Sequence, residues 1–316
     1  MSILSLVMEM RAYFEGWYFK QQNDTEALAF IPSFHIDKNH RYCAFIQVVT
    51  PDAAYSVKYP ATALAAQSHR PILRIGNNIF SPQGVEPDIE QPQLSVHGCL
   101  SYDRHRRPSY DIMGPFRWVP AMECRHSVVS LAHRVNGQII INGRSYLFQD
   151  GHGYIEGDRG CSFPQSYAWT QCSWGDNSLM LSEATIPFLG MHFRGIIAAV
   201  LLNGREYRLA TYRGARLLRA KDGEIVIRQG AYTLTAKLLK KQELSLPAPV
   251  SGAMIRAIKE SLCCQAAYCL EKMASRCWIS YHRWLALNMS TTNSYSKTDI
   301  FTNKKRLPKG SRLITY

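Results

Sequence analysis

The sequence lacks the features that would carry it across or into a membrane. None of its 316 residues belongs to an apolar run long enough for a transmembrane helix, which needs about 18 residues. The apolar start has neither a basic segment nor an A-x-A site, so it does not resemble a signal peptide. The nine cysteines are odd in number, irregularly spaced and without a C-x-x-C, which is typical of reduced thiols. We therefore expect a cytoplasmic protein.

Familiar fingerprints of cofactor and nucleophile sites are also missing. The chain has no G-x-G-x-x-G, no Walker loop and no nucleophile elbow of the Ser-His-Asp type. No cysteine has the spacing of a zinc site, and His126 and His133 have opposite parity along an expected strand. The sequence therefore predicts neither a cofactor nor a metal.

Positive charge is plentiful but unevenly spread. Residues 247–316 hold eleven Lys or Arg against three Asp or Glu, which is +8 of the total +13 and leaves +5 for the first 246 residues. A nucleic-acid surface should lie on the patterned part of the chain, interleaved with aromatic residues. We therefore expect no nucleic-acid partner, whereas transient contact with a membrane is compatible with this composition.

No long helical period occurs before residue 250. Short β-rich runs are separated instead by turn dipeptides at Asn136-Gly137, Asn142-Gly143, Asn203-Gly204 and Asp222-Gly223. The clearest hairpin is expected from strands at about 194–202 and 205–213. The pattern predicts an all-β fold of antiparallel strands, either a sandwich or a barrel.

A faint internal echo suggests two units. The runs "YFEGWYFKQQ", "LAFIPSFHID" and "YCAFIQVVT" resemble, in order, "SYAWTQCSW", "LMLSEATIPFLG" and "GIIAAVLLNG", with Ile31-Pro32 and Ile186-Pro187 at matching places. We predict similar β-units over residues 11–140 and 141–271, although coincidence between short β patterns is an alternative. Residues 272–316 show no steady period and are predicted to be an irregular basic tail.

The run "AYFEGWYFK" places an acid in line with aromatic residues. Read as a strand, it carries Tyr13, Glu15, Trp17 and Phe19 on one face. If that face points inward, burial would raise the pKa of Glu15 and make it a proton donor. The alternative is an acid at a barrel mouth that is paired with an arginine or a lysine.

A second aromatic run, "GYIEGDRGCSFPQSYAWTQ", carries two acids. Glu156 and Asp158 share a strand face, and the adjacent Arg159 could orient one of them. Two rings and one amide then line a strand face suited to a ligand: Tyr167, Trp169 and Gln171. The alternative is a salt-bridged turn followed by a core strand.

The run "DIMGPFRWVPAMECRHSVVSLAH" lies between these two motifs. Its Gly and Pro residues indicate a loop over the structure, and Glu123 with His126 could act as an acid–base pair. The alternative is that both residues satisfy buried backbone groups beneath the loop.

Together these motifs resemble the tocopherol cyclase family, in particular its bacterial members of uncertain role. The resemblance rests on "YFEGWYFK" and "GYIEGDRGCSFPQSYAWTQC", with support from "GNNIFSPQGV", "YDIMGPFRWVPAMECRHSVVSLAH" and "EYRLATYRGARL", and it covers roughly Arg11 to Ala266. The photosynthetic cyclases have E-K-x-W-G-x-x-F-P at the middle motif, where Gly157 and Arg159 replace the Lys and the Trp. After Lys272 the sequence no longer resembles the family's terminal strand.

The resemblance implies two lipocalin-like β-barrels or half-barrels, and cyclisation of a prenylated quinol without a cofactor. In that reaction an acid protonates the prenyl double bond and the phenol oxygen attacks the resulting tertiary cation. Glu15, Glu156, Trp17 and Trp169 are residues of the appropriate types.

We therefore predict an apolar cavity that holds a small molecule, prenylated if the resemblance extends to the substrate. The candidate acids are Glu156, Glu15 and Asp158. The candidate substrate-binding residues are Trp17, Phe19, Tyr167, Trp169, Gln171, Arg159 and His126. The alternative function is a lipocalin-like binder or carrier without catalysis, and an acid enclosed by the cavity would favour the enzyme.

Overall fold

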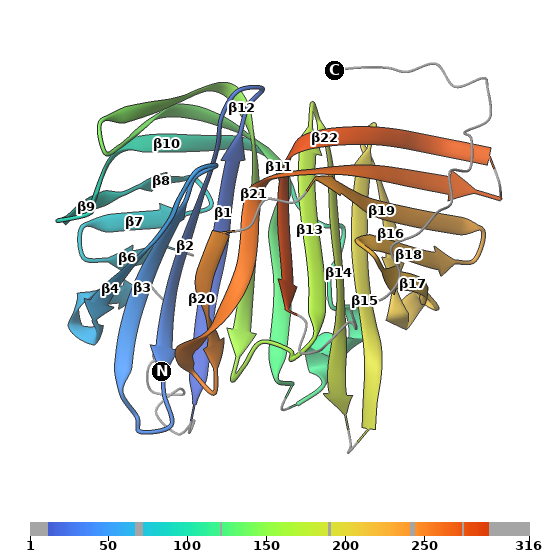
Figure 1. Cartoon of the computed structure of the whole chain (residues 1–316), viewed down its shortest axis with the longest axis horizontal. Helices are drawn as coiled ribbons and strands as arrows, with labels where there is room; N and C mark the ends of the chain where they lie inside the picture. Colours follow the sequence, from blue (N-terminus) through green and yellow to red (C-terminus); the bar gives the residue numbers. More distant parts are fainter. Residues whose placement is uncertain are drawn as a thin grey trace.

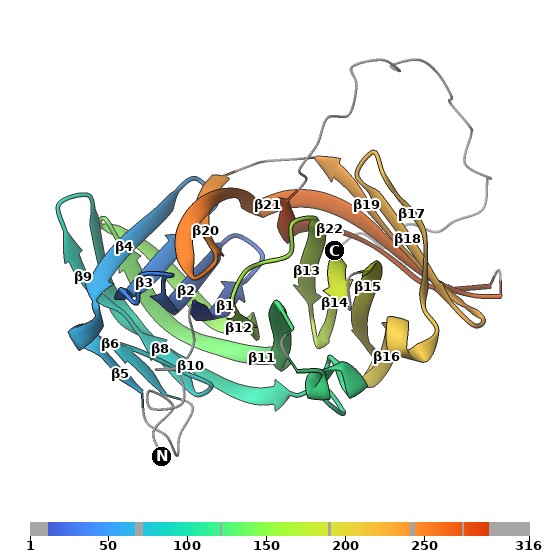
Figure 2. The same cartoon turned by 90° about the horizontal axis from the view of Figure 1, so that it is seen from below.

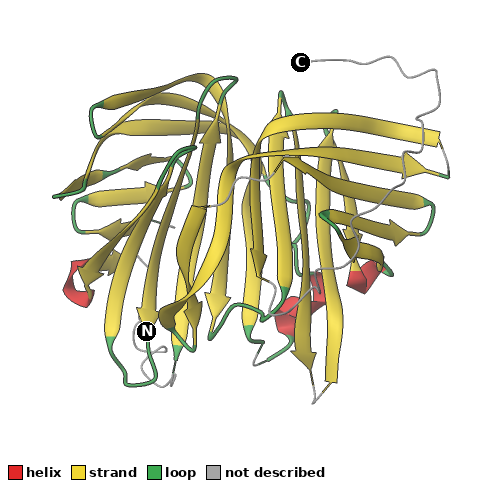
Figure 3. Ribbon diagram, viewed as in Figure 1, coloured by secondary structure: helices red, strands yellow, loops and turns green. Residues whose placement is uncertain are grey.

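Strands dominate the structure, a computed structural model that describes residues 12–66, 72–120, 122–188, 191–240, 244–273 and 275–290. The helices in this part are three short 3-10 turns: η1 (Ala61–Ala63), η2 (Gly114–Trp118) and η3 (Thr211–Arg213). No helix in these ranges is long and apolar enough to cross a membrane. The all-β prediction is confirmed (Figure 3).

The first sheet contains the first twelve strands, all paired in antiparallel fashion (Figure 1). Its strands are β1 (Tyr13–Gln22), β2 (Ala27–Ile36), β3 (Tyr42–Val49), β4 (Ala54–Pro60), β5 (Leu64–Ala66), β6 (Leu73–Ile75), β7 (Asn78–Ser81), β8 (Gly84–Glu86), β9 (Asp88–Gln91), β10 (Leu94–Arg106), β11 (Cys124–Ile141) and β12 (Arg144–Gly160).

The second sheet contains the ten strands that follow, again antiparallel. They are β13 (Tyr167–Trp174), β14 (Asn177–Phe188), β15 (Met191–Leu202), β16 (Arg205–Ala210), β17 (Arg216–Lys221), β18 (Glu224–Gln229), β19 (Tyr232–Lys240), β20 (Leu244–Val250), β21 (Ala253–Lys272) and β22 (Ser275–Ser290).

The two sheets repeat one strand order. The first runs β4-β3-β2-β1-β12-β11 and the second β16-β15-β14-β13-β22-β21. In each sheet a 3-10 turn, η1 or η3, links the two edge strands, so the sheet curls into a nearly closed barrel (Figure 2). Ile31-Pro32 and Ile186-Pro187 lie in the corresponding strands β2 and β14. The repeated order supports the two lipocalin-like units expected from the sequence.

The boundary between the sheets differs from the one predicted at residue 140. The first sheet continues to Gly160, and the second begins at Tyr167. Residues 142–143 form the turn of the β11–β12 hairpin inside the first barrel, because Ile141 pairs with Arg144. The echoed runs lie in β1, β2 and β3 of the first sheet and in β13, β14 and β15 of the second.

Three of the four predicted turns are two-residue hairpin turns. The flanking residues pair at Ile141–Arg144, Leu202–Arg205 and Lys221–Glu224. The fourth, Asn136-Gly137, lies within β11, where the register with β12 shifts between Val135 and Gly137. Gly137 has a φ of 129°, and a Cβ there would lie 2.2 Å from the Cys99 carbonyl oxygen. This glycine therefore allows a β-bulge. An Asn-Gly pair in a bulge and one in a hairpin turn look the same in the sequence.

The tail prediction is wrong for residues 275–290. These residues form β22, which pairs with β21 and also with β13, and so completes the second barrel. The neighbouring strands on both sides provide partners for its backbone hydrogen bonds. It is therefore a strand although its sequence shows no steady period. The rest of the predicted tail, residues 291–316, lies outside the described residues.

Each barrel has its own apolar core, and a third cluster joins them. The third cluster combines Tyr18 and Tyr154 of the first barrel with Trp169 and Met180 of the second. Polar side chains also cross the interface. The buried Lys20 ammonium donates to Gln171 Oε1 at 2.9 Å, and the Gln22 amide donates to the Ser173 carbonyl at 2.9 Å.

A matched pair of glycines tests how the β20–β21 turn is docked. Gly252 and Gly204 both have left-handed backbones, with φ of 73° and 76°. A Cβ at Gly252 would lie 1.8 Å from the Ile36 carbonyl oxygen of β2, whereas nothing lies within 4 Å of one at Gly204.

We expect Gly204→Ala to lower the free energy of unfolding by about 1–2 kcal/mol, the cost of the left-handed backbone. Gly252→Ala should cost about 3 kcal/mol or more, because the turn must also move off β2. Urea denaturation followed by tryptophan fluorescence measures both values. Equal losses for the two variants would contradict the close docking of this turn.

Candidate functional site

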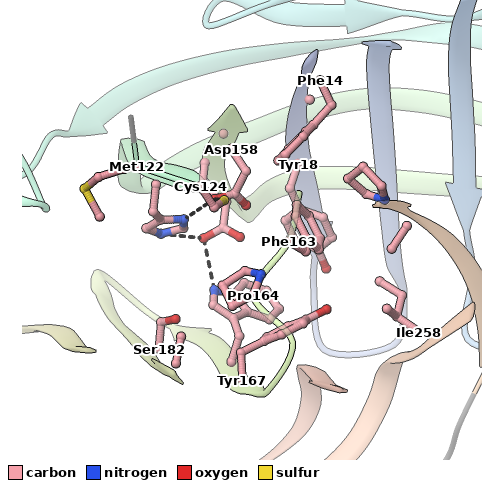
Figure 4. A pocket seen from close by; sticks show the side chains of 18 of the residues that line it. Phe14, Tyr18, Met122, Cys124, Asp158, Phe163, Pro164, Tyr167, Ser182 and Ile258 are labelled. Carbon is pink, nitrogen blue, oxygen red and sulfur yellow. Dashed lines mark hydrogen bonds and ion pairs between the residues drawn. The ribbon is translucent and has the colours of Figure 1, made fainter. Parts of the chain in front are cut away.

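A cavity of about 180 Å³ lies where the two barrels meet (Figure 4). Strands of both units and the loop that contains η2 contribute to its wall. The wall is mainly apolar and strongly aromatic; its rings include Phe14, Tyr18, Phe116, Phe163, Tyr167 and Trp169. Polar side chains also interrupt it, and three of them lie together: His126, Glu156 and Asp158. The others include Ser33, His35, Gln47, Ser182 and Thr211.

The pleat of β12 brings these polar groups to the cavity. Side chains alternate along a strand, so Tyr154, Glu156 and Asp158 point to one face. Directly opposite residues of antiparallel strands share a face, and Glu156 is opposite Tyr18 of β1 while Asp158 is opposite His126 of β11. The sheet register therefore places a histidine beside two carboxylates.

Glu156 is enclosed and held by donors from both barrels. It is only 6% exposed. Its Oε2 accepts a hydrogen bond from the Tyr154 hydroxyl at 2.6 Å and another from Trp169 Nε1 at 3.1 Å. His126 Nε2 lies 3.4 Å from the same oxygen, within ion-pair range but without a hydrogen bond. No described hydrogen bond goes to Oε1, so this oxygen of a cavity-lining residue is available to a ligand.

Burial sets the protonation of Glu156 near neutrality. It raises the pKa of this carboxyl to about 7, against the opposing effects of the His126 charge and of the bonds from Tyr154 and Trp169, while Asp158 raises it further. A general acid or base works best when its pKa lies near the working pH. Glu156 can therefore both release and accept a proton at neutral pH.

Asp158 holds His126 in place and favours its charged form. The His126 Nδ1–H donates to Asp158 Oδ1 at 3.0 Å, which leaves Nε2 facing Glu156. Burial alone would lower the pKa of His126, but the Asp158 and Glu156 carboxylates outweigh burial and raise it to about 9. Below that pH the imidazolium lies between the two carboxylates and carries a proton toward Glu156.

The same three side chains form the one group in the described part of the chain whose donor atoms could surround a metal ion. Those atoms lie within 4.8 Å of one another. Three of them, His126 Nδ1, Asp158 Oδ1 and Glu156 Oε2, already take part in hydrogen bonds within the site. A metal ion would have to replace those bonds.

Six of the predicted site residues border the cavity. They are Glu156, Asp158, His126, Trp17, Tyr167 and Trp169. His126 contacts the acids, rather than pairing with Glu123 as one reading of the sequence suggested. Trp17 borders the cavity while it also packs against the core of the first barrel.

Glu15 does not join Glu156 in the cavity, contrary to the prediction. It is opposite Arg159 in the β1–β12 pair, on the strand face away from Glu156. Its carboxylate accepts a hydrogen bond from the Tyr13 hydroxyl at 2.7 Å. Burial raises the pKa of Glu15, opposed by the Tyr13 bond and by Arg159. Arg159 therefore faces Glu15 and does not orient Glu156 or Asp158.

Two further predicted residues lie outside the cavity wall. Phe19 belongs to the core of the first barrel, with its ring centroid 5.8 Å from that of Phe80. Gln171 is fully buried and holds Lys20 across the barrel interface. The reason is the same for both: the strands β1 and β13 are buried on both faces, so an inward-facing residue need not face the cavity.

Sequence reasoning missed much of the wall. Tyr18 was placed on the opposite face of β1 from the expected ligand surface, yet its ring packs edge-to-face on Trp169, with centroids 5.4 Å apart. Phe116 and Met122 come from the loop between β10 and β11. The phrase "GPFRWVPAM" did indicate a loop that covers the structure, which was the available signal.

The fold and the site together define a class: two nearly closed antiparallel barrels with an enclosed carboxylate at their junction. No family model matches this chain, and no curated protein matches it. Solved structures do resemble it in fold. A structure of CghA with Sch210972 has a TM-score of 0.57 at 12% identity, covering 89% of this chain and 88% of that one.

A second CghA structure has a TM-score of 0.57 at 11% identity, with 89% and 88% coverage. Kievitone hydratase from Nectria haematococca covers 89% of both chains at 11% identity, with a TM-score of 0.49. At such identities the likeness to CghA shows the fold alone. Nothing in these comparisons points to the tocopherol cyclases in particular, so that resemblance stays a prediction.

We expect Glu156 and His126 each to make a contribution to the free energy of unfolding that falls as the pH rises. The buried His35 and His133, whose pKa values burial lowers to about 3, act in the opposite direction below pH 6.5, so the test is the difference between the wild type and each variant. The folded pKa of Glu156, about 7, exceeds the ordinary 4.5, so its contribution is complete below pH 4.5 and is lost as the pH rises through 7. The contribution of His126 is complete below pH 6.5 and is lost through pH 9. Urea denaturation at a series of pH values measures this dependence.

Two variants separate the contributions. The difference in the free energy of unfolding between the wild type and Glu156→Gln should change between about pH 4.5 and 7, and the difference for His126→Gln between about pH 6.5 and 9. Asp222→Asn, which alters a carboxylate 65% exposed in a turn, serves as the control and should leave the curve unchanged. A Glu156→Gln curve parallel to that of the wild type would show that this carboxyl does not titrate as described.

Proposed function

We propose that the protein is an acid–base catalyst that acts on an apolar small molecule held between its two barrels. The observation that carries this proposal is the enclosure of Glu156: a cavity-lining carboxyl, almost fully buried, with a pKa near 7. In a carrier, a carboxyl at the entrance of the cavity that only contacted solvent would be exposed. Enclosed groups with shifted pKa values are typical of catalytic sites.

The arrangement supports proton transfer to and from one point of a bound molecule. Glu156 Oε1 would exchange the proton with the ligand, while Tyr154 and Trp169 stabilise the charge left on Oε2. His126, fixed by Asp158, would supply or withdraw the compensating proton through Nε2. The chain's own groups therefore suffice for a reaction that starts and ends with a proton transfer.

The aromatic wall suits a reaction in which positive charge develops on the ligand. Tyr18 and Trp169 present rings next to the acid, and the negative faces of such rings stabilise cations. Protonation of an alkene produces such a cation, and an internal hydroxyl can then close a ring. Cyclisation of a prenylated quinol, which the sequence motifs suggest, is the specific reaction we propose.

A second candidate is a carrier that binds the same kind of ligand without changing it. The size of the cavity bears on this choice. At about 180 Å³ it is smaller than the ~300–1,000 Å³ of common ligand pockets, so it would enclose the reacting end of a long ligand rather than all of it. A carrier would be expected to enclose the apolar tail as well, and this favours the enzyme.

The test compares Glu156 of β12, which lines the cavity, with Glu15 of β1, which lies on the other face of the same sheet. Glu156→Gln should abolish turnover, by at least about a hundredfold, because the amide keeps the shape but cannot give up a proton. Glu15→Gln is the matched control and should keep nearly full turnover, because Glu15 lies outside the cavity. Prenylated hydroquinones incubated in D₂O, with mass spectrometry of the products, report both ring closure and uptake of solvent deuterium.

Ligand binding is measured in parallel through quenching of tryptophan fluorescence. Both variants should bind the prenylated hydroquinone as tightly as the wild type does. Binding by the wild type with no product from any hydroquinone would favour the carrier. Mass spectrometry of small molecules that copurify with the protein would then identify its cargo.

A further inference from the structure

Three separate segments border the cavity, and we call them the rim: residues 116–118, 191–194 and 254–256. Each contributes a half-buried residue to the cavity wall, namely Phe116, Phe193 and Met254. The Phe116 and Phe193 rings stack with centroids 5.8 Å apart, so two of the segments are in contact. In the shared view of Figures 1 and 3, η2 and the β20–β21 turn lie toward the same end of the molecule.

Each rim segment also exposes a large apolar side chain. These are Trp118, Met191 and Ile255, which are 73%, 69% and 74% exposed. All three lie within two residues of a wall residue, although they come from different parts of the chain. Exposed apolar side chains beside an apolar cavity indicate a surface that meets an apolar phase.

Each segment carries one arginine and no acid: Arg117, Arg194 and Arg256. The Arg117 guanidinium lies 4.3 Å from the centroid of the Trp118 ring. The other two arginines interact with acids of neighbouring segments. Glu183 pairs with Arg194 at 2.6 Å, and Arg256 opposes the rise that burial causes in the pKa of Glu123. Glu123 also acts on His192, whereas Arg117 has no acid within ion-pair distance among the described residues. Three arginines against two acids leave the rim with a net positive charge beside its apolar side chains.

We propose that the rim docks on the surface of an anionic lipid bilayer and places the cavity mouth against it. Tryptophan and arginine are suited to this boundary, because their apolar parts enter the headgroup region while their polar parts stay hydrated. The three apolar side chains provide shallow insertion, and the arginines attract anionic headgroups. A ligand too long for the cavity can then leave its tail in the bilayer.

The observations favour a bilayer over a protein partner. The rim consists of short separate segments, namely part of η2 and the first residues of β15 and β21, each with a single exposed apolar side chain, rather than a continuous face that could bury a standard protein interface. It also borders an apolar cavity, which a lipid phase can supply with ligand directly. The proposal does not depend on catalysis at Glu156, since docking is measured without substrate.

Flotation with vesicles tests the docking. The full chain is mixed with vesicles of phosphatidylcholine alone, or of phosphatidylcholine with phosphatidylglycerol at about three to one. We expect binding to the anionic vesicles, weakened by salt, and little binding to the neutral ones. Trp118→Ser and Ile255→Ser should each weaken it about tenfold, because each removes one inserted side chain. Arg117→Gln should weaken binding to anionic vesicles only.

Leu218→Ser and Leu147→Ser are the matched controls, because these side chains are 58% and 50% exposed but lie outside the rim. They should bind as the wild type does. Quenching by doxyl-labelled lipid should fall in Trp118→Phe, which places this ring in the bilayer. Absent binding, equal binding to neutral vesicles, or equal losses in the controls would overturn the proposal. Self-association that depends on Trp118 without vesicle binding would assign the rim to a second copy instead.

Discussion

The site depends on keeping one carboxyl away from water while two barrels supply its hydrogen bonds. An ionised carboxylate moved into a protein interior loses several kcal/mol of hydration. Tyr154 of the first barrel and Trp169 of the second each donate to Glu156, and bonds to a charged group return about 1.5–3 kcal/mol apiece. Compensation is therefore partial, and this is why the carboxyl titrates near neutrality rather than near 4.5.

The same bonds tie the chemistry to the assembly of the fold. Trp169 can reach Glu156 only while β13 is packed against β12, and the third apolar cluster is what holds these strands together. The Lys20–Gln171 bond crosses the same interface and is itself buried. A shift between the barrels would therefore leave Lys20 and Gln171, as well as Glu156 and Trp169, buried without their hydrogen-bond partners. The need to keep these buried hydrogen bonds therefore fixes one relative placement of the two barrels.

The sequence predicted the fold class and part of the site for identifiable reasons. Turn dipeptides and period-two runs are local signals, and they identified the strands and three of the hairpin turns. Glu156 and Trp169 were found because both lie in aromatic runs. Glu15 was misplaced because β1 is buried on both faces, one in the first core and one at the barrel interface, and periodicity does not tell which face meets the cavity.

The partnership of His126 with Asp158 could not be read from the sequence. It depends on the register of β11 against β12, which shifts at irregularities between Val128 and Ser130 and again before His133. A shift of one residue would turn a side chain to the other face. Likewise, β22 is a strand because β13 and β21 pair with it, and its own sequence carries little period.

The two barrels share a strand order but contribute unequally to the site. The acid, its histidine and its tyrosine all come from the first barrel. Much of the opposite wall comes from the second barrel, through Ser182, Ala184 and Ile197. Substitutions at these three positions can reshape the pocket without touching the proton-transfer groups. Proteins with this arrangement can therefore differ in their ligand while they keep the same acid.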